Sequence, residues 1–243
     1  MRNADQSDAP AVNQLLPDPL PAEPLSLFRS WFDEAHARRV QPNPNAMSLA
    51  TIDPDGSPAV RVVLCKRMRL DPGFLVFFTN YNGRKGRALD HTPRAAVCFH
   101  WDVLDRQVRI EGPITRSPAV ESDEYYASRP LVSRASAWAS DQSAAVASRD
   151  ELVAKLHAVE QKFGINLDRD GDVRGDSGVG PVIPRPENWG GFRLWAQRVE
   201  LWVGGVGRLH DRAAWTRTLV PANVDAVPGF APAGDWQRTR VQP

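Results

Sequence analysis

Short apolar runs separated by turn residues constrain the fold of this 243-residue chain more than any other feature of its sequence. Residues 47–52 and 59–67 flank the turn Asp53-Pro-Asp-Gly56, and an Asp-Gly pair between two apolar runs is typical of a β-hairpin. Similar runs predict further strands at residues 73–79, 95–101 and 107–114, and a last hairpin that pairs 192–203 with 208–216. The sequence therefore predicts a mostly antiparallel sheet.

Apolar residues at helical spacing accompany these strands. Leu25, Phe28, Phe32 and Ala35 would share one face of a helix, which the Pro-rich stretch 41–46 follows and ends. Helices are also expected at residues 81–89, 118–128 and 149–163. This mixture indicates an α+β or barrel-like fold. We expect a single domain over residues 23–243, with a mobile arm at 1–22 before it and an extended loop at 165–188 within it.

The composition excludes several classes of protein. The chain is 42% hydrophobic and 24% charged with a net charge of +1, so we expect neither nucleic acid nor a membrane as a partner. Cys65 and Cys98 are its only thiols, too few for a disulfide scaffold or a cysteine-based metal site, and no metal is expected. No run reaches the ~18 apolar residues of a membrane helix. The first residues lack the apolar core of a signal peptide, so we expect a cytoplasmic protein.

The segment Trp202-Val-Gly-Gly-Val-Gly-Arg-Leu-His-Asp-Arg212 concentrates chemically active side chains. On an extended strand, Arg208, His210 and Arg212 would line one face. Two fixed cations beside a titratable imidazole suit a planar, anionic, heteroaromatic ligand. The alternative for this segment taken alone is a solvated hairpin strand. Its glycines, Gly204, Gly205 and Gly207, follow no dinucleotide-binding pattern and are expected in a turn.

Trp202 and this Arg-Leu-His-Asp-Arg pentad resemble the C-terminal signature of the pyridoxine/pyridoxamine 5′-phosphate oxidases. The resemblance runs from about residue 21 to about residue 215. Other blocks match in order and spacing: Arg61-Val-Val-Leu-Cys-Lys66, Phe77-Phe-Thr-Asn80, Arg84-Lys85, Arg106-Gln107, Tyr125 to Pro130, Gln142-Ser143 and Trp189-Gly-Gly-Phe-Arg193. The resemblance implies a split β-barrel that forms a homodimer and binds two flavin mononucleotides (FMN) at the subunit interface.

An FMN site needs cations for its phosphate and hydrogen bonds and a flat wall for its ring. Arg61, Arg84 and Lys85 are the cationic candidates, and the last two lie at an expected helix start, where backbone N–H groups favour anions. The alternative for each one alone is a surface charge. The resemblance implies that FMN is bound by Arg61, Lys66, Phe78, Thr79, Arg84, Lys85, Gln107, Gln142, Ser143, Trp202 and Arg212.

The resemblance also implies a substrate site. Lys66, Tyr125, Arg129 and Ser133 match positions that hold the 5′-phosphate of the vitamin, and Arg208 and His210 match the catalytic residues over its pyridine ring. The implied reaction is the oxidation of pyridoxamine or pyridoxine 5′-phosphate to pyridoxal 5′-phosphate, by hydride transfer from C4′ to flavin N5. Molecular oxygen would take the electrons and form hydrogen peroxide, and the amine would leave as ammonia.

The chain departs from the family pattern at the edges of this site. Residues 9–17 of the N-terminal arm lack the Arg and Tyr with which the family covers its substrate, and Gly83 stands where a Ser is common. Two alternatives therefore stay open: a flavin oxidase acting on another planar substrate, such as a phenazine precursor, and a flavin-binding relative without activity. Lys66, Tyr125, Arg129 and Ser133 favour a phosphorylated substrate over the first, and Arg208 and His210 favour an enzyme over the second.

Overall fold

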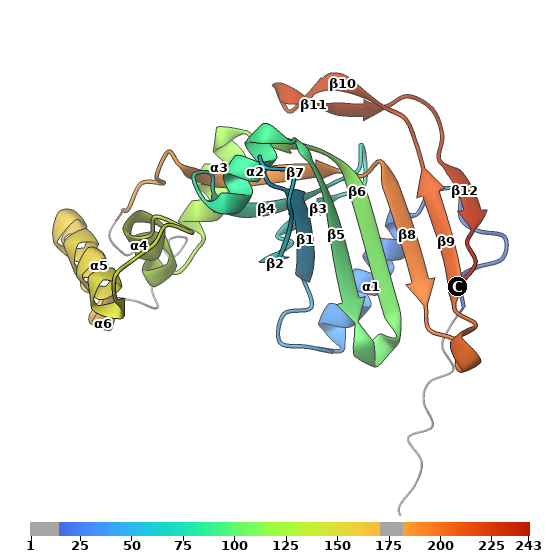
Figure 1. Cartoon of the computed structure of the whole chain (residues 1–243), viewed down its shortest axis with the longest axis horizontal. Coiled ribbons are helices and arrows are strands. Elements are labelled where there is room, and N and C mark those ends of the chain that lie inside the picture. The colour runs from blue at the N-terminus through green and yellow to red at the C-terminus, as the bar shows by residue number, and fades with distance from the viewer. Residues whose placement is uncertain (1–14, 171–181) are drawn as a thin grey trace, which may run out of the picture.

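The structure is a computed structural model that describes residues 15–170 and 182–243 (Figure 1). The predictions for residues 1–14 of the arm and 171–181 of the loop lie outside the described residues. Antiparallel strands dominate: β1 (Ala46–Ile52), β2 (Pro58–Leu64), β3 (Arg67–Arg69), β4 (Phe74–Asn80), β5 (Arg94–Trp101), β6 (Arg106–Arg116), β7 (Trp189–Trp195), β8 (Arg198–Val203), β9 (Asp211–Thr216), β10 (Leu219–Val224), β11 (Val227–Pro232) and β12 (Gln237–Arg240).

The strands form one curled sheet and one separate hairpin. The main path of the sheet runs β12-β9-β8-β6-β5-β1-β2, and a branch runs from β6 through β7 and β4 to β3. Strands β10 and β11 pair with each other and lie at one end of the sheet (Figure 1). The expected α+β fold with a mostly antiparallel, barrel-like sheet is thus confirmed.

Strand β6 joins the two parts of the sheet. Along residues 106–111 it pairs with β8, and at Ile114–Arg116 it pairs with β7 instead. The exchange of partners occurs around Gly112, where an added Cβ would lie 1.8 Å from the carbonyl oxygen of Trp195. A side chain at this position would therefore force the two strands apart.

Helices cover the sheet and extend from one end of it. Helix α1 (Leu25–Ala37) packs on the sheet, and α2 (Arg84–His91), α3 (Ala119–Ala127) and α5 (Arg149–Phe163) form where the sequence predicts them. Helices α4 (Leu131–Ala139) and α6 (Leu167–Asp170) were missed, as were β10, β11 and β12. Pro130 follows α3 and resembles a stop signal, but it is also the N-terminal cap of α4, a place where proline is tolerated. Helices α4, α5 and α6 gather away from β8 and β9 (Figure 1).

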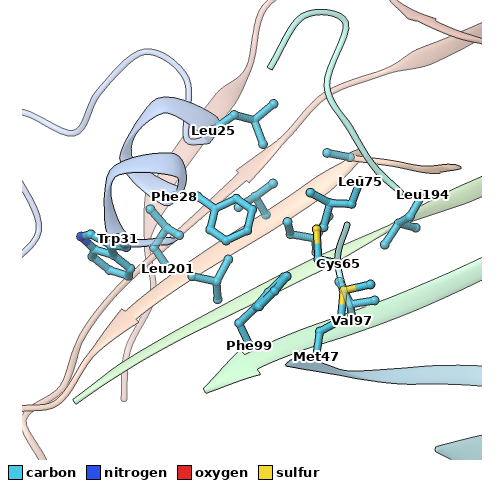
Figure 2. Packing of buried hydrophobic residues seen from close by; sticks show 14 of the residues in the cluster. Leu25, Phe28, Trp31, Met47, Cys65, Leu75, Val97, Phe99, Leu194 and Leu201 are labelled. Carbon is cyan, nitrogen blue, oxygen red and sulfur yellow. The ribbon is translucent and has the colours of Figure 1, made fainter. Parts of the chain in front are cut away.

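The main core lies between α1 and the inner face of the sheet. Figure 2 shows Phe28 and Trp31 of α1 reaching towards Phe99 and Leu201 of the strands. Phe28 is fully buried, and its ring centroid lies 5.2 Å from that of Phe99. Cys65 belongs to this core, and burial raises the pKa of its thiol to about 12. Leu16, within the segment predicted as a mobile arm, is also buried, so the described end of that segment lies against the sheet.

Three strand predictions need correction. The run 192–203 is not one strand, because β7 ends at Trp195 and β8 begins at Arg198, and only β8 pairs with β9. The run 59–67 is interrupted, because β2 ends at Leu64 and β3 begins at Arg67, which leaves Lys66 between two strands. The second strand of the last hairpin begins at Asp211, because Val206–Arg208 form a turn of 3₁₀ helix instead. Arg208 has a φ of 66°, and an added Cβ on Gly205 would lie 2.0 Å from the carbonyl oxygen of Leu209. The chain folds back on itself here, so Arg208, His210 and Arg212 do not line one face of an extended strand.

Candidate active site

One cavity of about 540 Å³ brings together most of the predicted cofactor and substrate residues. Its walls come from β2, β4, β7, α2, α3 and α4 and from the segments beside them. The predicted residues that line it are Arg61, Lys66, Phe78, Thr79, Lys85, Tyr125, Arg129, Ser133 and Gln142. A cavity of this size is typical of a small-molecule site.

One end of this cavity is cationic. The Lys85 ammonium donates to the Thr79 hydroxyl at 3.0 Å and also to Gln142 Oε1. Burial lowers the pKa of Lys85, and the positive charge of the nearby Arg61 lowers it further. Arg61 donates to the Thr51 hydroxyl at 2.7 Å, and burial lowers its pKa as well. Neither cation is paired with a carboxylate within the described part of the chain, so this end can accept an anion.

Arg84 and Ser143 lie beside this end, where they line a neighbouring cavity of about 410 Å³ together with Arg61 and Lys85. Helix α2 begins at Arg84, as predicted, with Gly83 as its N-terminal cap. Arg84 already has a partner, because its Nε donates to Oδ2 of the buried Asp53 at 2.7 Å. Asp53 was missed in the sequence, where it stood only as a turn residue.

The other end of the large cavity combines aromatic rings with another half-buried cation, Arg129. The rings of Phe78 and Tyr125 stack with centroids 4.1 Å apart, and Trp189 lies 5.6 Å from Phe78 in nearly the same orientation. The Arg129 guanidinium lies 4.8 Å from the Trp189 ring, and burial lowers its pKa. Arg129 Nη1 is buried without a hydrogen-bond partner, so the site holds a donor that a bound acceptor would satisfy.

Lys66 and Ser133 complete this second end. The Lys66 ammonium lies 5.8 Å from the Tyr125 ring centroid, and Ser133 stands in the first turn of α4. Trp189 lies in one of the sequence blocks that resemble the family, but the sequence analysis assigned it no role in the site. Its part in the cavity wall follows from the pairing of β7 with β4, which sequence spacing does not reveal.

The remaining predicted residues form a second group on another part of the sheet. Gln107 of β6 is paired with Trp202 of β8, and Trp202 is paired with Arg212 of β9, so these three side chains form one row across the strands. The His210 ring lies 4.7 Å from that of Trp202, and its Nδ1 accepts a hydrogen bond from the Gly205 amide at 3.2 Å. Arg208 precedes it in the 3₁₀ turn.

A single chain does not bring the two groups together. Four strands separate β2, which carries Arg61, from β9, which carries Arg212, or about 24 Å along the sheet. The two groups also point to opposite faces. Arg61 is paired with the buried Leu49, whereas Gln107, Trp202 and Arg212 alternate with the buried Val108, Leu201 and Ala213. A site that uses both groups therefore needs a second copy of the chain.

The residues of the large cavity fit an FMN. Arg61 and Lys85 offer unpaired positive charge for a phosphate, Thr79 and Gln142 offer polar atoms beside it, and Phe78 offers an aromatic surface. Among the described residues, no cluster of His, Cys, Asp or Glu could hold a metal ion. No helix in the described ranges is long and apolar enough to cross a membrane.

Two protein-family models match this chain. Residues 32–163 match the model described as pyridoxamine 5′-phosphate oxidase, and residues 189–243 match the pyridoxine 5′-phosphate oxidase C-terminal dimerisation region. The second region contains Trp202, His210 and Arg212 and indicates that the protein forms a dimer.

Relatives of known name agree with these matches. The chain is 46% identical over 221 residues to a pyridoxine/pyridoxamine 5′-phosphate oxidase of Cupriavidus metallidurans, covering 91% of this chain and 89% of that protein. It is 44% identical over 231 residues to the protein of the same name from Thermosynechococcus vestitus, covering 95% of this chain and 93% of that protein.

Solved structures share the fold. PhzG from Burkholderia lata, solved with tetrahydrophenazine-1-carboxylic acid, superposes with a TM-score of 0.75 at 29% identity, over 96% of this chain and 99% of that one. An FMN-binding protein from Nostoc punctiforme superposes with a TM-score of 0.61 at 16% identity, over 91% and 98%. The chain therefore belongs to the pyridoxamine 5′-phosphate oxidase family, and its cofactor is FMN.

Proposed function

We propose that this protein is an FMN-dependent oxidase, EC 1.4.3.5, that converts pyridoxamine 5′-phosphate, pyridoxine 5′-phosphate or both to pyridoxal 5′-phosphate. The observation that carries the proposal is the second set of cationic and hydroxyl side chains that lines the large cavity. Arg61 and Lys85 account for the phosphate of FMN, which leaves Lys66, Tyr125, Arg129 and Ser133 to hold another phosphate. A substrate with its own phosphate explains why the same cavity is lined by two pairs of cations, Arg61 with Lys85 and Lys66 with Arg129.

The residues at this second end have distinct tasks. Arg129 supplies a fixed fork of donors, including the unpartnered Nη1, and Lys66 supplies a point charge. Tyr125 and Ser133 add directional hydroxyl groups. Together they bind the substrate by its phosphate and leave the pyridine ring to lie towards the flavin.

Arg208 and His210 act at the opposite end of the substrate and come from the second copy of the chain. Arg208 orients the phenolate and amine side of the pyridine ring, and His210 hydrogen-bonds the phenolic oxygen attached to that ring. Bound FMN supplies a two-electron acceptor that molecular oxygen regenerates. In the balanced reaction, pyridoxamine 5′-phosphate, oxygen and water give pyridoxal 5′-phosphate, ammonia and hydrogen peroxide. Holding the reacting atoms ~3–3.5 Å apart is the main catalytic contribution of the protein.

The second candidate function is the oxidation of another planar substrate. The likeness to PhzG, solved with a tetrahydrophenazine carboxylic acid, favours it. A carboxylate would engage Arg129 as a phosphate does. However, such a substrate has a single planar anionic group and would leave part of the set Lys66, Tyr125 and Ser133 unused.

The proposed substrate is tested by anaerobic mixing. We expect the yellow flavin absorbance of the purified dimer to bleach on addition of pyridoxamine 5′-phosphate, because the flavin accepts two electrons from it. Dephosphorylated pyridoxamine at the same concentration is the control and should bleach it far more slowly. Rapid bleaching by a reduced phenazine carboxylic acid, with none by either vitamin form, would instead support the second candidate.

Arg129 and Arg208 should affect different kinetic constants. A phosphate contact is similar in the ground and transition states, so Arg129→Ala should raise KM with a smaller change in kcat. Arg208 faces the reacting end, so Arg208→Ala should also lower kcat. Steady-state kinetics with pyridoxamine 5′-phosphate measures both, and FMN content serves as the control because neither residue is assigned to the flavin. An Arg129→Ala enzyme with unchanged kinetics would contradict the phosphate assignment.

Hybrid dimers test whether each site takes residues from two copies. The Arg129→Ala and Arg208→Ala chains are co-expressed with different tags, and the hybrid is isolated by two affinity steps. The hybrid would contain one intact site and one doubly defective site, so at substrate concentrations well below KM we expect about half of the wild-type activity. Activity no greater than the mean of the two parent dimers would mean that each site is built from a single chain.

The pH dependence of FMN affinity should reflect Lys85. Its positive charge favours the phosphate, and this charge is lost as pH rises through the pKa of the group. Because burial lowers that pKa from the usual 10.5, the affinity should begin to fall at a lower pH than for an exposed lysine. Fluorescence titration of the apoprotein with FMN above about pH 8 measures the effect, away from the range in which the phosphate itself titrates. In Lys85→Arg, which stays charged throughout this range, the fall should disappear.

A further inference from the structure

Glu200 of β8 is a buried carboxylate surrounded by arginines on the outer face of the sheet. Its side chain is 3% exposed. Oε1 accepts hydrogen bonds from Arg212 Nε at 3.2 Å and from Arg212 Nη2 at 2.7 Å. Oε2 lies 3.5 Å from Arg109 Nη1 and 3.7 Å from Arg198 Nη2. A buried carboxylate is costly unless it is paired, and these arginines supply its partners.

Arg212 donates hydrogen bonds to two residues, Glu200 and Gln242, and still has N–H groups left over for a ligand. A guanidinium has five N–H donors, of which Arg212 gives two to Glu200 and one, from Nη1, to the Gln242 carbonyl at 2.8 Å. One N–H on each terminal nitrogen is therefore left for a ligand. The Arg212 side chain is 23% exposed, so these donors are within reach of one.

The strand register explains how Glu200 reaches Arg212. Glu200 is paired with Ala214 on β9, and Arg212 lies two residues from Ala214 on the same face. Because the side chain of Ala214 is a single methyl group, the guanidinium can lie diagonally against the carboxylate. Arg212 itself is paired with Trp202, in the row that ends at Gln107.

We infer that Glu200 is a positioning residue for the flavin: its carboxylate fixes the Arg212 guanidinium so that the remaining N–H groups meet the FMN ring. This inference rests on the proposed function, which assigns Arg212 to the cofactor. Glu200 itself does not touch the flavin. Both hydrogen bonds from Arg212 end on the single oxygen Oε1, and the charge of the carboxylate strengthens them. Without that charge the two bonds would weaken, and Arg212 would sample other rotamers.

The test compares Glu200→Gln with a matched control on the same face. Glutamine keeps the shape and one acceptor oxygen but removes the charge, so we expect the Kd of FMN for the apoprotein to rise about 10-fold. The visible circular dichroism of the bound flavin should change as well. The control is Glu111→Gln: Glu111 contacts Arg109 and Arg198 but not Arg212, and this variant should bind FMN with wild-type affinity.

A double-mutant cycle separates positioning from a general structural effect. If Glu200 acts through Arg212, then Glu200→Gln should weaken FMN binding no further in an Arg212→Ala background. Equal weakening in both backgrounds, or equal effects of Glu200→Gln and Glu111→Gln, would overturn the inference. If Glu200→Gln does not fold, as judged by the thermal unfolding of the apoprotein, Glu200→Asp gives the same cycle with a displaced charge.

The cycle also distinguishes this inference from the proposed function. If Arg212→Ala alone leaves FMN affinity unchanged, the assignment of Arg212 to the cofactor fails. If Arg212→Ala weakens binding and Glu200→Gln does not, the assignment stands and only the positioning role of Glu200 is refuted.

Discussion

The positions of the site residues depend on strand β6, which changes its pairing partner from β8 to β7 around Gly112. One part of β6 pairs with β8 and carries the row that includes Gln107, whereas its last residues pair with β7, whose other edge builds the cavity wall with β4. The close approach of the Trp195 carbonyl leaves no room for a side chain at the exchange. Both groups of site residues are therefore attached to one continuous hydrogen-bonded framework over a shared core.

The same framework keeps the two groups apart within one chain. Side chains alternate between the faces of a strand, and the inner face is filled by the core. Arg61 uses the inner face at the free edge of β2, and Arg212 uses the outer face beyond four intervening strands. No local movement brings them together, since both are fixed by strand pairing. The proposed site, which uses both groups, therefore requires two copies of the chain, and the C-terminal dimerisation region indicates that the protein forms a dimer.

Buried carboxylates recur behind the arginines assigned to the cofactor. Asp53 accepts from Arg84 in the first group, and Glu200 accepts from Arg212 in the second. By contrast, Arg61 and Lys85 face the cavity beside neutral hydroxyl and amide groups. The unpaired cations supply attraction for an anion, and the paired ones supply donors in a set direction. The resemblance to the family implied the arginines, but nothing in the sequence indicated these partners, because Asp53 lies in a turn and Glu200 in an apolar strand.

By itself, the sequence determined the features that depend on neighbours along the chain. The β1–β2 hairpin, helix α5 and the start of α2 at Arg84 follow from turn residues, apolar spacing and helix-start signals, and the ordered motifs determined the family. Only the tertiary structure decided where strands end and what they meet. In the tertiary structure, the apolar run 59–67 is interrupted before Arg67 and Arg208 lies in a turn. Trp189 lies beside Arg129, and the predicted site residues form two groups. The reason is that these outcomes depend on pairing and close packing between segments far apart in the sequence, which local periodicity does not encode.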